Sequence, residues 1–115
     1  MSNVSTEIIN SIQLSKIIVV LVIEDDSKAS DLIDCLYDSG IKNYEIALRT
    51  NNSRKSADII SKKGLDINLG IGTVLTIDDV NFASDIGANF ALAPGTNKTV
   101  IDEANRLNLP FLPGV

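Results

Sequence analysis

The chain has 115 residues, 44% of them hydrophobic, and its ten basic and fifteen acidic residues give a net charge of −5 at pH 7. This length and composition allow one domain with a real hydrophobic core and exclude a disordered tail. The acidic balance argues against nucleic acid as a partner, and the absence of histidine leaves a zinc site almost without ligands.

The first apolar run of the chain, IIVVLVI at 17–23, is too short to cross a bilayer. Polar residues precede it and EDD follows it, which is unlike a signal peptide. The lone Cys35 falls inside an apolar helical pattern, so we expect a buried thiol rather than a disulfide. These features together predict a cytoplasmic protein without a membrane partner.

The same run is continuous and rich in β-branched residues, which predicts a strand buried on both faces. Residues 27–40 follow, with apolar residues at helical spacing and Gly40 as a stop, so the two segments form one βα unit. YEIALRT at 44–50 predicts the second strand. The helix predicted at 51–64 has an Asn/Ser start and a glycine end.

Two further βα units and a last strand complete the pattern. DINLGIGTVL at 66–75 precedes a helix at 76–87, which begins with Thr76 as N-cap and has Asp79 three residues on, a weak variant of the capping box. The remaining segments are NFALAPG at 89–95, a helix at 96–108 and LPFLPGV at 109–115. Strict alternation of this kind predicts an α/β fold with parallel strands joined by right-handed helical crossovers.

Side chains of the YEIALRT strand alternate between two chemically different faces. Tyr44, Ile46 and Leu48 point one way, and Glu45, Ala47 and Arg49 point the other. In an antiparallel edge strand the charged face would only be wetted by solvent. A central strand of an open, doubly wound sheet has helices on both faces, whereas a barrel strand turns one face into the lumen. The charged face therefore favours a (β/α)8 barrel.

Candidate site residues lie near the carboxyl ends of the predicted strands, which is where barrels carry their chemistry. They are Arg49, Thr73 and the Pro94–Gly95 pair. Gly70 and Gly72 begin a phosphate-binding fingerprint, but its third glycine is missing, so we expect close packing at a strand end instead. A structural pair between Glu45 and Arg49 would need both long side chains to lean together, since four residues of strand separate their Cα atoms by about 13 Å.

Four short motifs carry a resemblance to a known family. They are LRT at 48–50 preceded by Glu45, GIGTVL at 70–75, GANFALAPG at 87–95 and PFLPGV at 110–115. In order and spacing they resemble the successive strand motifs of the bacterial 2-keto-3-deoxy-6-phosphogluconate (KDPG) / 4-hydroxy-2-oxoglutarate (KHG) aldolases. The similarity runs from about Lys16 to Val115 and includes the opening STEIINSIQ. Ile71 stands where the family usually has Ala, and Ala93 where it often has Ser.

The resemblance implies a TIM-barrel fold, of which this chain would supply the first four βα units and the fifth strand. Residues 1–115 would form one partial domain with a helical lead-in at roughly 5–13. The family's members are class I aldolases of the Entner–Doudoroff pathway, which cleave a 2-keto-4-hydroxy acid to pyruvate and an aldehyde through a lysine Schiff base. The implied partners are therefore a small 2-keto acid, pyruvate, and further copies of the chain in a homotrimer; no cofactor or metal is implied.

Residue roles follow from the same resemblance. Glu45 would be the general acid/base, and a carboxylate on the inner face of a barrel is partly desolvated, which raises its pKa toward the range useful for proton transfer. Arg49 and Thr73 would bind the pyruvyl carboxylate, which a guanidinium can grip with two parallel hydrogen bonds. Pro94 would help to wall the site.

The family's Schiff-base lysine lies on the next strand, and its phosphate site lies later still. None of the ten basic residues here occupies the matching place, so we expect the 115-residue chain alone to be inactive. A fragment, a truncated gene product and a deliberate half-barrel would share this sequence. A non-catalytic half-barrel that assembles with another chain is therefore an alternative function, because truncation leaves unpaired strand edges.

A response-regulator receiver domain is the alternative from another class. VLVIEDD at 20–26 and LDINL at 65–69 resemble its acidic pocket and phospho-acceptor strand, with Asp25 and Asp26 holding Mg²⁺ and Asp66 taking phosphate. The spacing argues against it, because the segment between Asp66 and Thr76 is too short for the helix and strand that a receiver needs there. The receiver's conserved lysine is also replaced, by Ala93.

Overall fold

Strands and helices alternate along residues 6–115, which are the residues that this computed structural model describes. The strands are β1 (Val19–Leu21), β2 (Asn43–Ala47), β3 (Asn68–Gly72), β4 (Phe90–Leu92) and β5 (Phe111–Leu112). The helices are α1 (Thr6–Ser15), the short 3-10 helix η1 (Asp26–Lys28), α2 (Ala29–Asp38), α3 (Ser53–Ser61), α4 (Ile77–Asp85) and α5 (Lys98–Arg106). The helical lead-in expected at roughly 5–13 would include residue 5, which lies outside the described residues.

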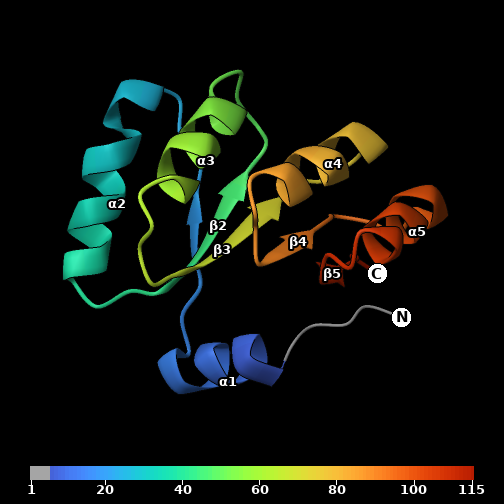
Figure 1. Cartoon of the computed structure of the whole chain (residues 1–115), viewed down its shortest axis with the longest axis horizontal. Helices are drawn as coiled ribbons and strands as arrows, with labels where there is room; N and C mark the ends of the chain where they lie inside the picture. The colour runs from blue at the N-terminus through green and yellow to red at the C-terminus, as the bar shows by residue number, and fades with distance from the viewer. Residues whose placement is uncertain (1–5) are drawn as a thin grey trace.

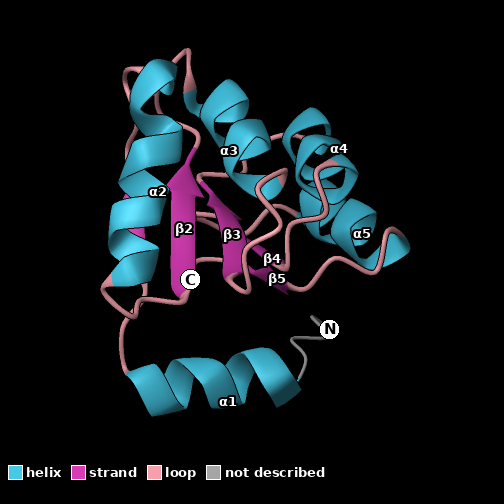
Figure 2. Cartoon of the chain, turned by 60° about the vertical axis from the view of Figure 1, so that its left-hand side comes forward, coloured by secondary structure: helices cyan, strands magenta, loops and turns pink. Residues whose placement is uncertain are grey.

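The five strands form one parallel sheet in the order β1-β2-β3-β4-β5. Each strand therefore pairs with the strand that precedes it in the chain, and the order never reverses as it does in a doubly wound sheet. Right-handed crossovers between successive neighbours place all their helices on one side of the sheet. Helices α2 to α5 accordingly follow one another along one side, while α1 lies beyond the amino ends of the strands (Figures 1 and 2).

The hydrophobic core lies between the sheet and this helix layer. Ile46 pairs in register with Leu21 on one side and Ile71 on the other, so the three side chains point to the same face. All three belong to a buried cluster that also contains residues of α2 to α5, such as Ile33 and Val80. Burying a large aliphatic side chain contributes about 1.5–3 kcal/mol, so this face anchors the strands against the helices.

The amino ends of the strands are covered by α1 through a buried polar contact. Asn43, the first residue of β2, is fully buried. Its amide nitrogen donates to Ser15 Oγ at 2.8 Å, and its amide oxygen accepts from Ser11 Oγ and from Asn68 Nδ2. Buried amides need such partners, so Asn43 fixes the position of α1 at the end of the sheet opposite to the predicted site.

Two predictions of burial are wrong. The run at 17–23, which contains β1, is not buried on both faces, because Val20 and Val22 are 52% and 47% exposed while Leu21 and Ile23 are buried. The helix layer covers only the face to which Leu21 points. Cys35 is exposed rather than buried, because α2 turns the side on which Ala29 and Ile33 lie toward the sheet.

The predicted helix boundaries are confirmed where the sequence contains specific end signals. Gly40 and Gly64 follow α2 and α3 with φ angles of +90° and +66°, a conformation that only glycine adopts without cost. Thr76 caps α4, and the predicted capping box with Asp79 is present. Within the described part of the chain, no helix has the length and apolar character that a bilayer crossing requires.

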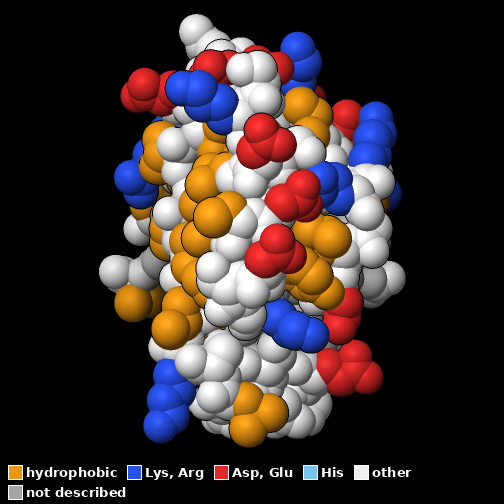
Figure 3. All heavy atoms as spheres, turned by 90° about the vertical axis from the view of Figure 1, so that its left-hand side faces the viewer, with side chains coloured by type: hydrophobic (Ala, Val, Ile, Leu, Met, Phe, Trp, Pro, Cys, Tyr) orange, Lys and Arg blue, Asp and Glu red, His pale blue; other side chains and the backbone are white. Residues whose placement is uncertain are grey.

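The face of the sheet away from the helix layer, and the outer edges of β1 and β5, have no partner strand within residues 6–115. Val20, Val22 and Leu32 lie exposed near the β1 edge, and apolar side chains form a band beside the acidic ones on this side of the molecule (Figure 3). Unpaired apolar edges promote strand pairing between molecules.

We therefore expect the isolated 115-residue chain to self-associate, as measured by size-exclusion chromatography with light scattering. Val22→Lys should shift the distribution toward monomer, because a charged edge resists pairing. Leu14→Lys is the matched control, since Leu14 is 86% exposed on α1 and belongs to no strand. A monodisperse wild-type monomer, or an equal effect of the two variants, would contradict this prediction.

Candidate active site

The site centres on Glu45, in the middle of β2. Glu45 pairs in register with Val20 of β1 and Gly70 of β3, and its side chain points to the face opposite to Ile46. The predicted division of the strand into an apolar and a charged face is thus confirmed: Tyr44 and Ile46 are fully buried in the core cluster, and Glu45 is only half-buried.

Two glycines of β3 make room on this face. A Cβ atom at Gly72 would lie 1.8 Å from Oε1 of Glu45, so the carboxylate rests directly against the backbone of β3. A Cβ atom at Gly70 would lie 2.2 Å from the ring of Phe90, which covers that position from β4. The close packing expected of these glycines is confirmed, and their partners are an acid and an aromatic ring.

Glu45 has an elevated pKa. Partial burial raises the pKa of its carboxyl group, and the positive charge of Arg49 opposes this effect without cancelling it. Desolvation disfavours the charged form of a carboxyl group, so this group holds a proton at a higher pH than an exposed glutamate does. A carboxyl group in this state is suited to donate and accept protons.

Arg49 and Thr73 meet beside this carboxyl group. Nε of Arg49 donates to Oγ1 of Thr73 at 3.4 Å, and Arg49 is near enough to Glu45 to influence its pKa. Arg49 is exposed and Thr73 is half-buried, so a small anion can reach both donors. Arg49 makes no direct ion pair with Glu45, which leaves its guanidinium free for another carboxylate.

Thr73 adopts an unusual backbone conformation, with φ of +59°. A left-handed conformation costs a β-branched residue about 1–2 kcal/mol. The neighbouring strand hydrogen bonds hold it in place: Leu48 N–H donates to the carbonyl of Gly72, and Val74 N–H donates to that of Leu92. Nothing in the local sequence TVL predicts this conformation, since glycine and asparagine are its usual signals.

The loop that carries Arg49 is tied to β1 and α3. The hydroxyl of Thr50 donates to the carbonyl of Ile23 at 2.6 Å, and the N–H of Thr50 donates to Oγ of the buried Ser53 at 3.0 Å. Asn52 adds a bond from its side-chain amide to the carbonyl of Glu24. The backbone at Arg49 is therefore fixed on both sides.

The connection after Thr73 is held by Asp79 of α4. Its Oδ2 accepts from the N–H groups of Leu75 and Thr76 at 2.9 and 3.1 Å, and its Oδ1 accepts from Nη2 of Arg54 at 2.7 Å. Burial alone would raise the pKa of Asp79, but the bonds from Leu75, Arg54 and Thr76 outweigh it and lower the pKa. The sequence predicted the capping role of Asp79, but it did not reveal the contact with Arg54, which is 25 residues away.

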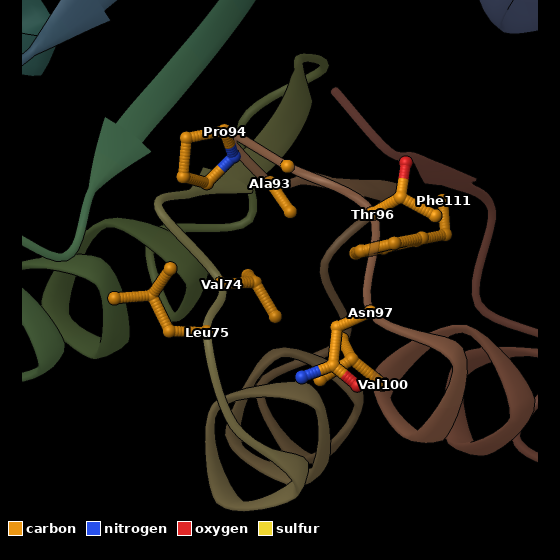
Figure 4. Close-up of a pocket in the computed structure, with 9 residues that line it drawn as sticks. Val74, Leu75, Ala93, Pro94, Thr96, Asn97, Val100 and Phe111 are labelled. Atoms are coloured by element: carbon orange, nitrogen blue, oxygen red, sulfur yellow. The ribbon is translucent and has the colours of Figure 1, made fainter. Parts of the chain in front are cut away.

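Pro94 lies at the same end of the sheet, one strand further along than Thr73. It lines a cleft of about 210 Å³ between the β3–α4 and β4–α5 connections, where Val74 points into the space between Pro94 and Val100 (Figure 4). Val74, Val100 and Phe111 of this cleft belong to the core of the helix layer. The structure thus brings Glu45, Arg49 and Thr73 together, whereas Pro94 borders a neighbouring cleft.

None of the strands in residues 6–115 contains a lysine. Five of the seven lysines, all of which lie in helices or loops, pair with a carboxylate: they are Lys42, Lys55, Lys62, Lys63 and Lys98. No group of three or more Asp, Glu, Cys or His side chains in the described chain gathers where a metal ion could be held.

The receiver hypothesis requires Asp25 and Asp66 at one end of the sheet. Asp25 follows β1 and caps η1, at the carboxyl ends of the strands. Asp66 precedes β3 and pairs with Lys42, which precedes β2, so it lies at the amino ends. The two acids are therefore at opposite ends of the strands, and a phospho-acceptor pocket cannot form.

The departures from the family pattern lie away from Glu45. Ile71 pairs in register with Ile46 and Ala91 and is fully buried in the core against the helices. Ala93 follows β4 and lines the cleft beside Pro94. Neither side chain alters the polar groups of the site.

Comparison with known proteins places these features in a family. The family described as KDPG and KHG aldolase matches residues 8–115. A 2-dehydro-3-deoxy-phosphogluconate aldolase of Haemophilus influenzae is 30% identical over the whole chain, which covers 54% of that relative. The corresponding protein of Treponema pallidum is 30% identical over 94% of the chain, and 51% of that relative is covered.

Solved structures of aldolases from the same family resemble this chain. The KDPG aldolase of Legionella pneumophila, with pyruvate captured at low pH as a covalent carbinolamine intermediate, superposes with a TM-score of 0.79 and 31% identity, over 85% of this chain and 48% of that one. The 2-keto-3-deoxy-6-phosphogluconate aldolase of Zymomonas mobilis gives a TM-score of 0.78 at 30% identity, over 85% and 47%. The chain thus spans about half the length of the relatives it matches.

A substitution at Gly72 tests whether the Glu45 carboxylate packs against the backbone of β3. Gly72→Ala places a methyl group where the carboxylate lies, so we expect a loss of about 1–3 kcal/mol in the free energy of unfolding, as is typical for overpacking. Gly95→Ala is the matched control, because nothing lies within 4 Å of a Cβ atom there. Urea denaturation measures both variants, and equal stabilities would show that Glu45 does not occupy this position.

Proposed function

Because the chain belongs to the KDPG and KHG aldolase family, we propose that it forms part of a class I aldolase that cleaves 2-keto-3-deoxy-6-phosphogluconate or 4-hydroxy-2-oxoglutarate to pyruvate and an aldehyde. Its parallel sheet and one-sided helix layer are about half of the TIM barrel that its structural relatives form, as the sequence predicted. The observation that carries the proposal is the convergence of Glu45, Arg49 and Thr73 on the sheet face that the helices leave open.

Glu45 is proposed as the general acid and base. Formation and dehydration of a carbinolamine, and interconversion of the iminium and the enamine, each require a proton to be moved near the keto carbon. Because burial raises its pKa, this carboxyl group keeps its proton to a higher pH than an exposed glutamate does, and it can serve as proton donor and as proton acceptor. Its contact with Gly72 supports this role, because it holds the carboxyl group against the strand rather than in bulk water.

Arg49 and Thr73 are proposed to bind the carboxylate of the 2-keto acid. The guanidinium offers paired N–H donors, and the Thr73 hydroxyl offers a donor from the neighbouring strand end. Both groups are near Glu45, so a carboxylate held by them would bring the adjacent keto carbon toward the proton-transfer group. Pro94 is proposed as an apolar wall at the next strand end, since it borders the cleft beyond Val74.

The Schiff-base lysine is proposed to come from a part of the barrel that these 115 residues do not contain. In the Legionella relative, pyruvate forms a covalent carbinolamine, which is the chemistry of an amine nucleophile. No strand in residues 6–115 offers such an amine to the open face. Without it there is no iminium to accept the electrons of the breaking carbon–carbon bond, so the 115 residues alone should bind but not react.

Two further features of the enzyme remain proposals. We infer a homo-oligomer, a trimer by analogy with the family, and a cytoplasmic location, for which the bacterial metabolic relatives and the unpaired thiol of Cys35 are the support.

Borohydride reduction in the presence of pyruvate tests the proposal. The complete protein that contains this segment should gain one reduced pyruvyl group, detected by intact-mass spectrometry, and the isolated 115 residues should gain none. Absence of the adduct on the complete protein would overturn the aldolase assignment. An adduct on the short chain would mean that one of its own lysines, such as Lys98, takes the catalytic place.

Glu45→Gln tests the role of the acid in the same assay series. We expect a fall of about 10²–10⁴-fold in kcat, which is the usual contribution of general acid–base catalysis. Glu103→Gln is the matched control, because Glu103 lies in α5, in the helix layer, and accepts two bonds from Arg106. Equal activity of the two variants would remove Glu45 from the mechanism.

A further inference from the structure

The two proposed carboxylate-binding residues, Arg49 and Thr73, belong to different loops. Arg49 lies in the β2–α3 connection and Thr73 in the β3–α4 connection. Their direct contact is long, at 3.4 Å between Nε and Oγ1, and Arg49 is exposed. Such a contact alone is too weak to set the spacing of the two loops, and the last strand bond between them, from Leu48 N–H to the carbonyl of Gly72, precedes both residues.

An ion pair joins α3 and α4, the two helices that follow these loops. Nη2 of Arg54, in the first turn of α3, donates to Oδ1 of Asp79, in the first turn of α4, at 2.7 Å. The same nitrogen lies 2.9 Å from Oδ2 of Asp78, and the guanidinium lies 4.9 Å from the centre of the Phe82 ring. Asp79 is mostly buried, with its side chain 15% exposed. Arg54 is therefore held in one orientation by charge and by the aromatic face.

Each end of this pair is linked by hydrogen bonds to the chain beside a site residue. On the α3 side, Ser53 precedes Arg54 and accepts from the N–H of Thr50, which directly follows Arg49. On the α4 side, Asp79 accepts from the N–H groups of Leu75 and Thr76. The contacts form a closed ring that runs from Arg49 through α3, the ion pair and α4 to Thr73, and returns through the Arg49–Thr73 bond.

We propose that Arg54 and Asp79 are positioning residues that set the spacing of Arg49 and Thr73 and thereby the affinity for the carboxylate of the 2-keto acid. The inference rests on the proposed function and adds two residues that touch no substrate. Loss of the pair would let the β3–α4 connection move relative to Arg49 while Glu45, which is seated on β2 and β3, stays in place. Binding should therefore suffer, and proton transfer should not.

The exchange of pyruvate methyl protons with D2O, followed by proton NMR on the complete protein, separates these two effects. It needs only the amine, Glu45 and the carboxylate site. For Arg54→Leu we expect KM for pyruvate to rise about tenfold with kcat within about twofold of wild type, the pattern expected when ground-state and transition-state binding are lost equally. Arg54→Lys keeps the charge and should recover most of the affinity.

Two further variants complete the test. Asp79→Asn keeps a carbonyl oxygen for the N–H groups of Leu75 and Thr76 but weakens the bond to Arg54. It should therefore raise KM for pyruvate as Arg54→Leu does. If Arg54→Leu does not fold, Asp79→Asn alone tests the proposal. The double variant should be no worse than either single one, because both remove the same interaction. Arg106→Leu is the matched control: it removes an arginine–carboxylate pair of 2.6 Å within α5 and should leave KM unchanged.

An unchanged KM in Asp79→Asn, or an equal rise in Arg106→Leu, would overturn the positioning role. A fall in kcat with KM unaltered would overturn it as well, because the pair would then act on the proton-transfer step. Absence of exchange in the wild-type protein would instead contradict the proposed function, so the two failures can be told apart.

Discussion

The contact between the Glu45 carboxylate and the backbone of Gly72 is the constraint on which the site depends. It requires β2 and β3 to run parallel in the observed register, in which Ala47 lies opposite Gly72. A shift of one residue would turn Glu45 into the helix layer and Ile46 to the open face. The burial of Ile46 between Leu21 and Ile71 therefore fixes the acid on the opposite face, and the core that stabilises the sheet also determines where the chemistry can occur.

Much of this arrangement could be predicted from the sequence because it follows from local patterns. The two-residue period of YEIALRT placed Glu45 and Tyr44 on opposite faces, and the alternation of strand and helix patterns predicted the parallel sheet. The glycine at residue 40 and the capping box of Thr76 marked helix ends correctly. Each of these features depends on interactions within a few residues of chain, which sequence patterns report directly.

Other features depend on contacts between distant segments, and the sequence did not reveal them. Cys35 and the outward side of β1 were expected to be buried because apolar spacing alone does not say which side of an element the neighbouring layer covers. Thr73 has a left-handed backbone conformation although it is neither glycine nor asparagine, the residues that usually indicate one. Hydrogen bonds from the adjoining strands hold this conformation. The Arg54–Asp79 pair joins two helices whose packing becomes evident only in the folded chain.

The central claim is that Glu45 is a partly desolvated carboxyl group on the open face of the sheet, next to Arg49. Titration of its side-chain carboxyl carbon by ¹³C NMR, with the signal assigned through Glu45→Gln, measures this directly. The account predicts a midpoint above the ordinary value of 4.5 and a further rise in Arg49→Met, because burial raises the pKa of Glu45 and the arginine lowers it. A midpoint at or below 4.5, or a fall in Arg49→Met, would contradict it.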